Sequence, residues 1–160
     1  MTTTLTAPAP VASLDAALLP GPTALHHRIE DRLATVAEAP ASLVVIGLLR
    51  KDTGWPLSTG ALTTVTSLLA GALRGEDWLA REDHTEFGVL VEGTPAAADV
   101  VAARMAGVVT GAVTGLIACA GVATLEPGLT AHEVERRAVL CLDAARHRGA
   151  NAVVHYSGTR

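Results

Sequence analysis

Aromatic side chains are nearly missing from this chain of 160 residues, which has two Trp, one Tyr and one Phe. Because 49% of the residues are still hydrophobic, Ala, Val and Leu must form most of the core. Lysine is even scarcer, since Lys51 stands alone beside eleven arginines. An anionic ligand would therefore be bound mainly by arginine guanidinium groups, which favour planar, forked contacts.

Other absences limit the class of protein. The formal net charge is −4, so the chain lacks the basic surface that general nucleic-acid binding needs. No run reaches the roughly 18 apolar residues of a membrane helix, and no basic residue precedes Arg28, which argues against a secretory signal. Only two cysteines are present, Cys119 and Cys141, and we expect both to be reduced core residues. The sequence thus predicts a cytoplasmic protein with no membrane or direct nucleic-acid contact, no metal and no cofactor.

Hydrophobic patterning divides the chain into a tail and one domain. Residues 1–17 are rich in Thr, Ala and Pro and predict a flexible N-terminal tail, which leaves a single domain over 18–160. Helical spacing of apolar residues predicts helices within 22–36, 57–74, 93–111 and 130–149. Short apolar runs predict strands at 42–49, 78–82, 86–92, 115–125 and 151–156, with a hairpin between the second and the third.

The first and last helices carry signals at their ends. Thr23 is the expected N-cap of the first helix, whose His26 and His27 are expected on the solvated face. In the last helix Thr130 is the expected N-cap, Glu133 would complete a capping box, and Gly149 follows as a left-handed terminator. Alternating strands and helices around a central hairpin predict an α/β fold (an α+β sandwich), in which helices flank a central mixed sheet of about five strands.

Three segments of the chain each carry a further motif. The opening LPGPTAL runs into HHRIEDRL, the hairpin reads AREDHTEFGVLV, and the last helix contains RRAVLCLDAARHRG. In this order and spacing they resemble the opening turn, the Ala-Arg-x-Gly-Gly-Asp-Glu-Phe signature and the last helix of the GGDEF domain. The GGDEF domains of diguanylate cyclases join two GTP molecules into cyclic di-GMP. The resemblance covers roughly residues 18–156 and implies the nucleotide-cyclase-like fold.

The resemblance also implies a degenerate signature. Asp83 and His84 stand at its two glycines, Thr85 stands at its metal-binding acid, and only Glu86 and Phe87 are kept. Two side chains and a new negative charge would then occupy the turn where the family brings a triphosphate close to backbone.

Further losses point the same way. The family has a second metal-binding Asp in its first strand, but residues 47–49 contain no carboxylate, and Val139 replaces an Asp of the last helix. Arg146 stands near the family's phosphate-contacting lysine and is a candidate phosphate contact. Because divalent ions held by carboxylates neutralise most of the charge in phosphoryl transfer, the resemblance implies a domain that is not an enzyme.

An Arg-x-x-Asp motif, Arg74 to Asp77, lies five residues before the degenerate signature. The family's inhibitory site, which binds cyclic di-GMP, has this motif at this distance and often a second arginine, for which Arg104 is the candidate here. An arginine makes forked bonds to guanine O6 and N7 or to phosphate, and a carboxylate accepts from guanine N–H groups. The resemblance therefore implies a cyclic di-GMP receptor at Arg74, Asp77 and Arg104, with a homodimer linked by the ligand.

Three alternatives stay open. The main alternative is a ligand-independent scaffold for dimerisation or for an unidentified regulatory protein, because an Arg-x-x-Asp turn at a helix end is an ordinary feature. GTP binding without turnover, through Arg146 and the remodelled hairpin, is a second. A metal cluster of Asp83, His84 and Glu86 is disfavoured, because neighbours along a hairpin point to opposite faces. Trp78, beside the turn, would either pack on the core or stack against a base.

Overall fold

The computed structural model describes residues 18–50, 57–83 and 85–158. The expected tail over 1–17 lies outside the described residues, as does His84 of the signature. Within this range the chain forms four helices and five strands, which supports the predicted order of elements. None of the described helices is long and apolar enough to cross a membrane.

The five strands form one mixed sheet in the order β2-β3-β1-β4-β5. Their bounds are Ala41–Arg50 for β1, Trp78–Arg81 for β2, Glu86–Glu92 for β3, Leu116–Thr124 for β4 and Val153–His155 for β5. The pairs β2–β3, β3–β1 and β1–β4 are antiparallel, and β4–β5 is parallel. The predicted mixed sheet and its hairpin are confirmed, although β5 is shorter than the 151–156 expected from the sequence.

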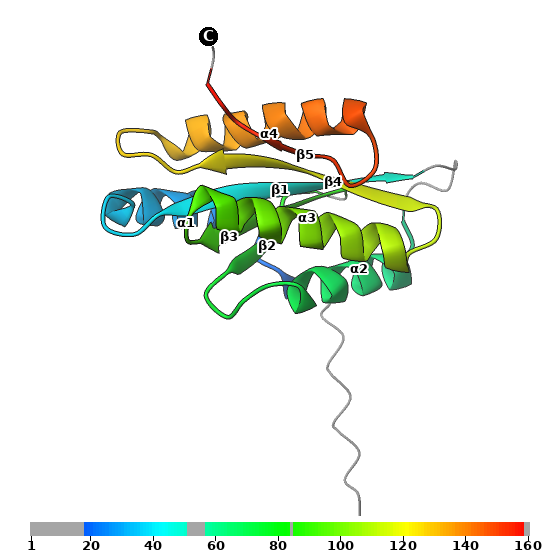
Figure 1. The fold of residues 1–160 in the computed structure, drawn as a ribbon. Helices are drawn as coiled ribbons and strands as arrows, with labels where there is room; N and C mark the ends of the chain where they lie inside the picture. Colours follow the sequence, from blue (N-terminus) through cyan, green and yellow to red (C-terminus); the bar gives the residue numbers. More distant parts are fainter. Residues whose placement is uncertain (1–17, 51–56, 84, 159–160) are drawn as a thin grey trace, which may run out of the picture.

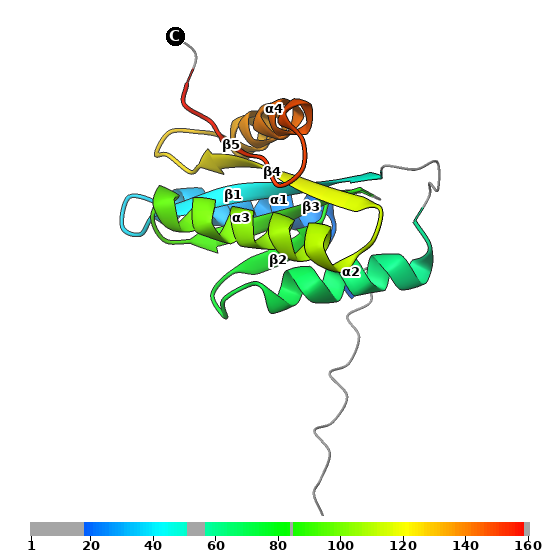
Figure 2. The same cartoon turned by 45° about the vertical axis from the view of Figure 1, so that its right-hand side comes forward.

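The four helices cover both faces of this sheet (Figures 1 and 2). They span Pro22–Thr35 (α1), Thr59–Gly71 (α2), Pro95–Ala112 (α3) and Ala131–Arg148 (α4). Alternate residues of the buried strand β1 point to opposite faces, so Val44 and Ile46 pack in the core with α2 and α3, while Leu43 and Val45 pack with α1 and α4. The fold is therefore a three-layer arrangement of helices, sheet and helices.

Some predicted helix ends are wrong. The N-cap of α1 is Gly21 rather than Thr23, because Pro22 has a fixed φ and no N–H group and therefore suits the first turn. Thr130 does cap α4, where its Oγ1 accepts from the Glu133 N–H (3.2 Å). The carboxylate of Glu133 does not complete a capping box; it is bound by Arg136 and Arg137. Gly149 has the expected positive φ, 106°.

Helix α4 lies directly against β4, and this contact places the side chains of the candidate site. A Cβ atom at Gly121 of β4 would collide with the backbone of Ala138 and Leu142 in α4, so only glycine permits this approach. The side chain of Leu142, a residue of α4, is fully buried between this helix and the sheet. Both cysteines are buried and unpaired, Cys119 in β4 and Cys141 in α4.

Candidate functional site

The turn between β2 and β3 satisfies its own polar groups. Asp83 Oδ1 accepts from both the Thr85 N–H (2.7 Å) and the Thr85 hydroxyl (3.1 Å). The N–H groups of Glu82 and Asp83 donate to the Glu86 carbonyl at 3.0 and 3.2 Å. An Asp that closes its own turn in this way stabilises the loop locally. The Asp83 carboxylate and Thr85 hydroxyl are therefore both engaged within the turn.

Glu86 and Arg146 form an ion pair at the start of β3. Arg146 Nη2 donates to Glu86 Oε1 (2.8 Å), and Arg146 Nη1 donates to Asp143 Oδ1 (3.2 Å). Glu86 is paired in register with Gly47 of β1. A Cβ atom at Gly47 would lie 3.0 Å from Arg146 Nη2 and 2.9 Å from Leu142 Cδ1. The absence of a side chain at Gly47 thus lets the guanidinium lie against β1 beside Glu86. The other kept residue of the signature, Phe87, is fully buried in the core.

Arg74 and Asp77 come together at the turn between α2 and β2. Asp77 accepts from the N–H groups of Arg74 and Glu92, both at 3.1 Å, and from Arg74 Nε at 3.3 Å. Arg74 Nη2 donates to the Glu92 carbonyl (2.6 Å). The Asp77 side chain is 0% exposed, whereas the Arg74 side chain is 40% exposed. The side chains of Arg74 and Asp77 therefore bind this turn to the end of β3, and part of Arg74 stays accessible to solvent.

The expected third member of that site, Arg104, makes no hydrogen bond or ion pair with Arg74 or Asp77 among the described residues. Arg104 is exposed on α3 and forms no hydrogen bond or ion pair with another described residue. Trp78, the first residue of β2, packs against the core beneath α1 and α4, and the Arg28 guanidinium lies 5.5 Å from its ring centroid. Packing is thus the outcome for Trp78 in this structure.

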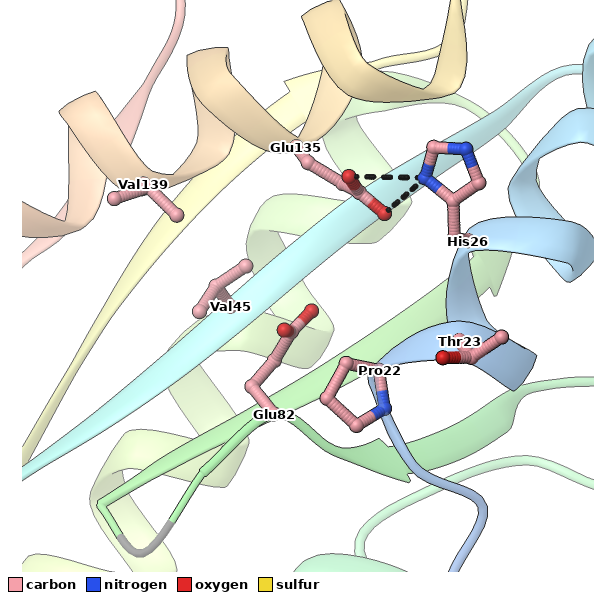
Figure 3. Close-up of a pocket in the computed structure, with 7 residues that line it drawn as sticks. All are labelled: Pro22, Thr23, His26, Val45, Glu82, Glu135 and Val139. Atoms are coloured by element: carbon pink, nitrogen blue, oxygen red, sulfur yellow. Dashed lines mark hydrogen bonds and ion pairs between the residues drawn. The ribbon is translucent and has the colours of Figure 1, made fainter.

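A groove opens on the face of the sheet that α1 and α4 cover, between these helices, β1 and the hairpin (Figure 3). Its volume is about 340 Å³, and it is lined by Pro22, Thr23, His26, Val45, Glu82, Glu135 and Val139. His26 Nδ1 lies 3.1 and 3.2 Å from the two carboxylate oxygens of Glu135, and His26 Nε2 lies 2.8 Å from Glu30 Oε1. His26 therefore links two helices and is not simply part of a solvated face, as the sequence had suggested.

The charges in the groove raise two pKa values. The hydrogen bond to Glu135 and the nearby charges of Glu135 and Glu30 raise the pKa of His26 above its ordinary value. Burial raises the pKa of Glu82 to about 7, helped by the negative charges of Glu135, Glu86 and Asp83. Among the described residues, no basic side chain forms an ion pair with Glu82.

The overall arrangement is that of solved GGDEF domains. The structure matches the GGDEF domain of DgcB from Caulobacter crescentus in complex with c-di-GMP, with a TM-score of 0.77, 18% identity and coverage of 92% of this chain and 97% of that one. It also matches the active GGEEF domain of a diguanylate cyclase from Vibrio cholerae (TM-score 0.75, 18% identity, 88% and 99% covered). A third match is the FimX GGDEF domain from Pseudomonas aeruginosa (TM-score 0.73, 24% identity, 89% and 99% covered). The chain has the GGDEF-domain fold.

The sequences themselves are distant. No family model and no curated protein sequence matches this chain. The resemblance seen in the sequence is thus confirmed for the fold, which is shared over nearly the whole of the compared GGDEF domains.

The residues of this GGDEF fold do not fit the two divalent ions that the family's chemistry implies. The positions that would carry the metal-binding acids hold Thr85 and residues 47–49, none of which is a carboxylate. Glu86, the nearest carboxylate of the kept signature, is already paired with the Arg146 guanidinium. Hard cations need several anionic or carbonyl oxygens. Among the described residues, no group of three His, Cys, Asp or Glu side chains is placed to hold a metal ion.

Sequence reasoning missed the contacts between distant segments of this GGDEF fold. Arg32 of α1 makes a forked contact with Glu92 of β3, with Nε and Nη2 at 2.8 and 2.7 Å from the carboxylate oxygens. Glu92 is thus held by Arg32 through its side chain and by Arg74 and Asp77 through its backbone. Pairs separated by 60 positions in the chain leave no local pattern that would reveal them.

Proposed function

We propose that residues 18–160 form a GGDEF-fold domain without cyclase activity. The observation that carries this proposal is the Arg146 guanidinium, which lies against Gly47 and is bound to Glu86. Joining two GTP molecules concentrates negative charge, which metal ions held by carboxylates must offset. Here Arg146 is paired with Glu86, the remaining acid of the signature. The positive guanidinium would repel a divalent ion at this position, where the family has ligands for one.

We propose further that the domain binds cyclic di-GMP at the turn of Arg74 and Asp77, with Arg104 as a second cation. The partly exposed Arg74 and the exposed Arg104 supply guanidinium groups that suit guanine edges and phosphates. The DgcB domain, which has the same fold, is in complex with this ligand. Because the Asp77 carboxylate is enclosed, its role in this proposal is to orient Arg74. Charged hydrogen bonds contribute roughly 1.5–3 kcal/mol each, so three of them at the upper end of this range make micromolar affinity attainable.

The test is isothermal titration of the purified chain with cyclic di-GMP, and in parallel with GTP and Mg²⁺. Arg104→Ala is the most informative variant, because Arg104 supports no other described residue, and Arg148→Ala, another exposed arginine, is its matched control. We expect micromolar binding of cyclic di-GMP by the wild type and by Arg148→Ala, and at least a tenfold weaker affinity for Arg104→Ala. Sedimentation with and without the ligand would show whether binding produces the proposed homodimer. Equal binding by all three proteins would contradict the proposed site.

A second candidate function is a scaffold for a protein partner. It is favoured by the enclosed Asp77 carboxylate and by three exposed apolar side chains, Val100 on α3 and Val139 and Leu140 on α4. In that case neither nucleotide would bind. GTP binding without turnover, the lesser candidate, would require Arg146 to leave Glu86, and it would appear as a GTP signal that the Arg104→Ala variant does not change.

A further inference from the structure

The imidazole of His26 lies between two carboxylates on different helices. Its Nδ1 faces both oxygens of Glu135 in α4, and its Nε2 faces Glu30 one turn further along α1. A neutral imidazole carries a single N–H group, so it can donate to only one of these carboxylates. Both contacts are favourable only for the imidazolium form. The imidazolium makes both contacts at once and adds an ionic attraction to the Nδ1–Glu135 contact, which is the one that links α1 to α4.

Glu82 forms the opposite wall of the same groove. Its side chain is half-buried next to β3, and it faces Glu135 across the groove with Val45 on the floor (Figure 3). When Glu82 is protonated, His26 is the one cation among the described residues that forms an ion pair with Glu135. When Glu82 ionises, two carboxylates share a partly desolvated groove, and the charged form is penalised.

The remaining titratable groups near this pair are few. Helix α1 contributes Glu30 and also His27, whose ring centroid is 6.4 Å from that of His26. Helix α4 contributes Glu135 and, at the adjacent hollow, His132. The hairpin contributes Asp83 and Glu86, and Arg146 already offsets Glu86.

We propose that this groove is a pH-sensitive latch, in which protons on His26 and Glu82 hold α1 against α4 and the loss of these protons as pH rises loosens α1. The two protons act in the same direction. His26 has a raised pKa, so its stabilisation is present below its unfolded pKa and is lost as pH rises through its folded pKa. Glu82 binds its proton more tightly in the folded protein than in the unfolded chain, because folding raises its pKa from 4.5 to about 7. The stability of the fold therefore also falls as pH rises through this range.

The latch predicts a defined pH response. Because the pKa of Glu82 is about 7 in the folded protein, loss of its proton between pH 6 and pH 8 would raise the unfolding equilibrium constant by at most about tenfold. Solvent screening of this half-buried group reduces that value. The local response should be larger in α1 than elsewhere. Hydrogen exchange, corrected for the intrinsic effect of pH, should show that α1 amides lose protection at pH 8 while those of α3 lose much less.

Three variants test the assignment. Glu82→Gln and His26→Gln keep the shape of the groove without the titrating group, so each should flatten the pH response of both the unfolding constant and α1 exchange. His132→Gln, an exposed histidine of α4 beside the same groove, is the control and should keep the wild-type response. The proposal is overturned if His26→Gln retains the wild-type response, or if α1 and α3 lose protection in parallel.

Discussion

The Asp77 carboxylate gives the sharpest test of how the Arg-x-x-Asp turn is built. Asp77→Ala removes the acceptor for two backbone N–H groups, those of Arg74 and Glu92, each at 3.1 Å. Hydrogen bonds to a charged group contribute about 1.5 kcal/mol each at the lower end of their range, and the half-exposed contact with Arg74 Nε adds about 0.5 kcal/mol. We therefore expect Asp77→Ala to lower the free energy of unfolding by about 3.5 kcal/mol. Asp77→Asn, which keeps one acceptor oxygen, should cost about half as much.

Urea unfolding at pH 7 without nucleotide is the appropriate assay. The matched control is Glu76→Ala, next to Asp77, whose carboxylate is 59% exposed and lies 3.9 Å from Arg74 Nε. Surface changes of that kind usually stay within about 0.5 kcal/mol. If Asp77→Ala also remained within about 0.5 kcal/mol of the wild type, the carboxylate would have no structural role. The reasoning that assigns it to the turn, and not to direct ligand contact, would then be refuted.

Three further predictions concern stability and use the same unfolding assay. Leu142→Ala, in the fully buried contact of α4 with the sheet, should cost about 2–5 kcal/mol, and a loss below about 1 kcal/mol would contradict the packing described. Thr130→Ala should cost about 1 kcal/mol, because it removes the N-cap of α4, whereas Thr130→Ser should be nearly neutral. Arg32→Ala should cost about 1–2 kcal/mol through the loss of its forked contact with Glu92, and Arg32→Lys should recover only part of this, so equal stability of Lys and Arg would argue against a forked contact.

The sequence allowed the order of elements to be predicted because each element depends on neighbouring residues. The apolar run of β1, the hairpin and the cap at Thr130 are local patterns, and all appear in the structure. The N-cap of α1 was misassigned to the polar Thr23, because the fixed geometry of Pro22 places the N-cap two residues earlier, at Gly21.

The candidate site was less accessible to sequence reasoning. Arg146 was predicted as a candidate phosphate contact of the last helix, but its contact with Glu86 depends on how α4 lies against β4 and on the space above Gly47. His26 and Glu135 are 109 positions apart, so only the fold brings them together. The Arg-x-x-Asp motif was found readily, yet its spacing could not reveal that the carboxylate is enclosed by backbone N–H groups.

The central claim, a GGDEF-fold domain without cyclase activity, is tested most directly by incubation with GTP and either Mg²⁺ or Mn²⁺. Chromatography would measure any cyclic di-GMP formed, and the active GGEEF domain from Vibrio cholerae would serve as the positive control. The account predicts that this chain forms no product under conditions in which the control does. Formation of cyclic di-GMP by the purified chain would contradict it, because the internal Arg146–Glu86 pair would then not prevent the site from using metal ions.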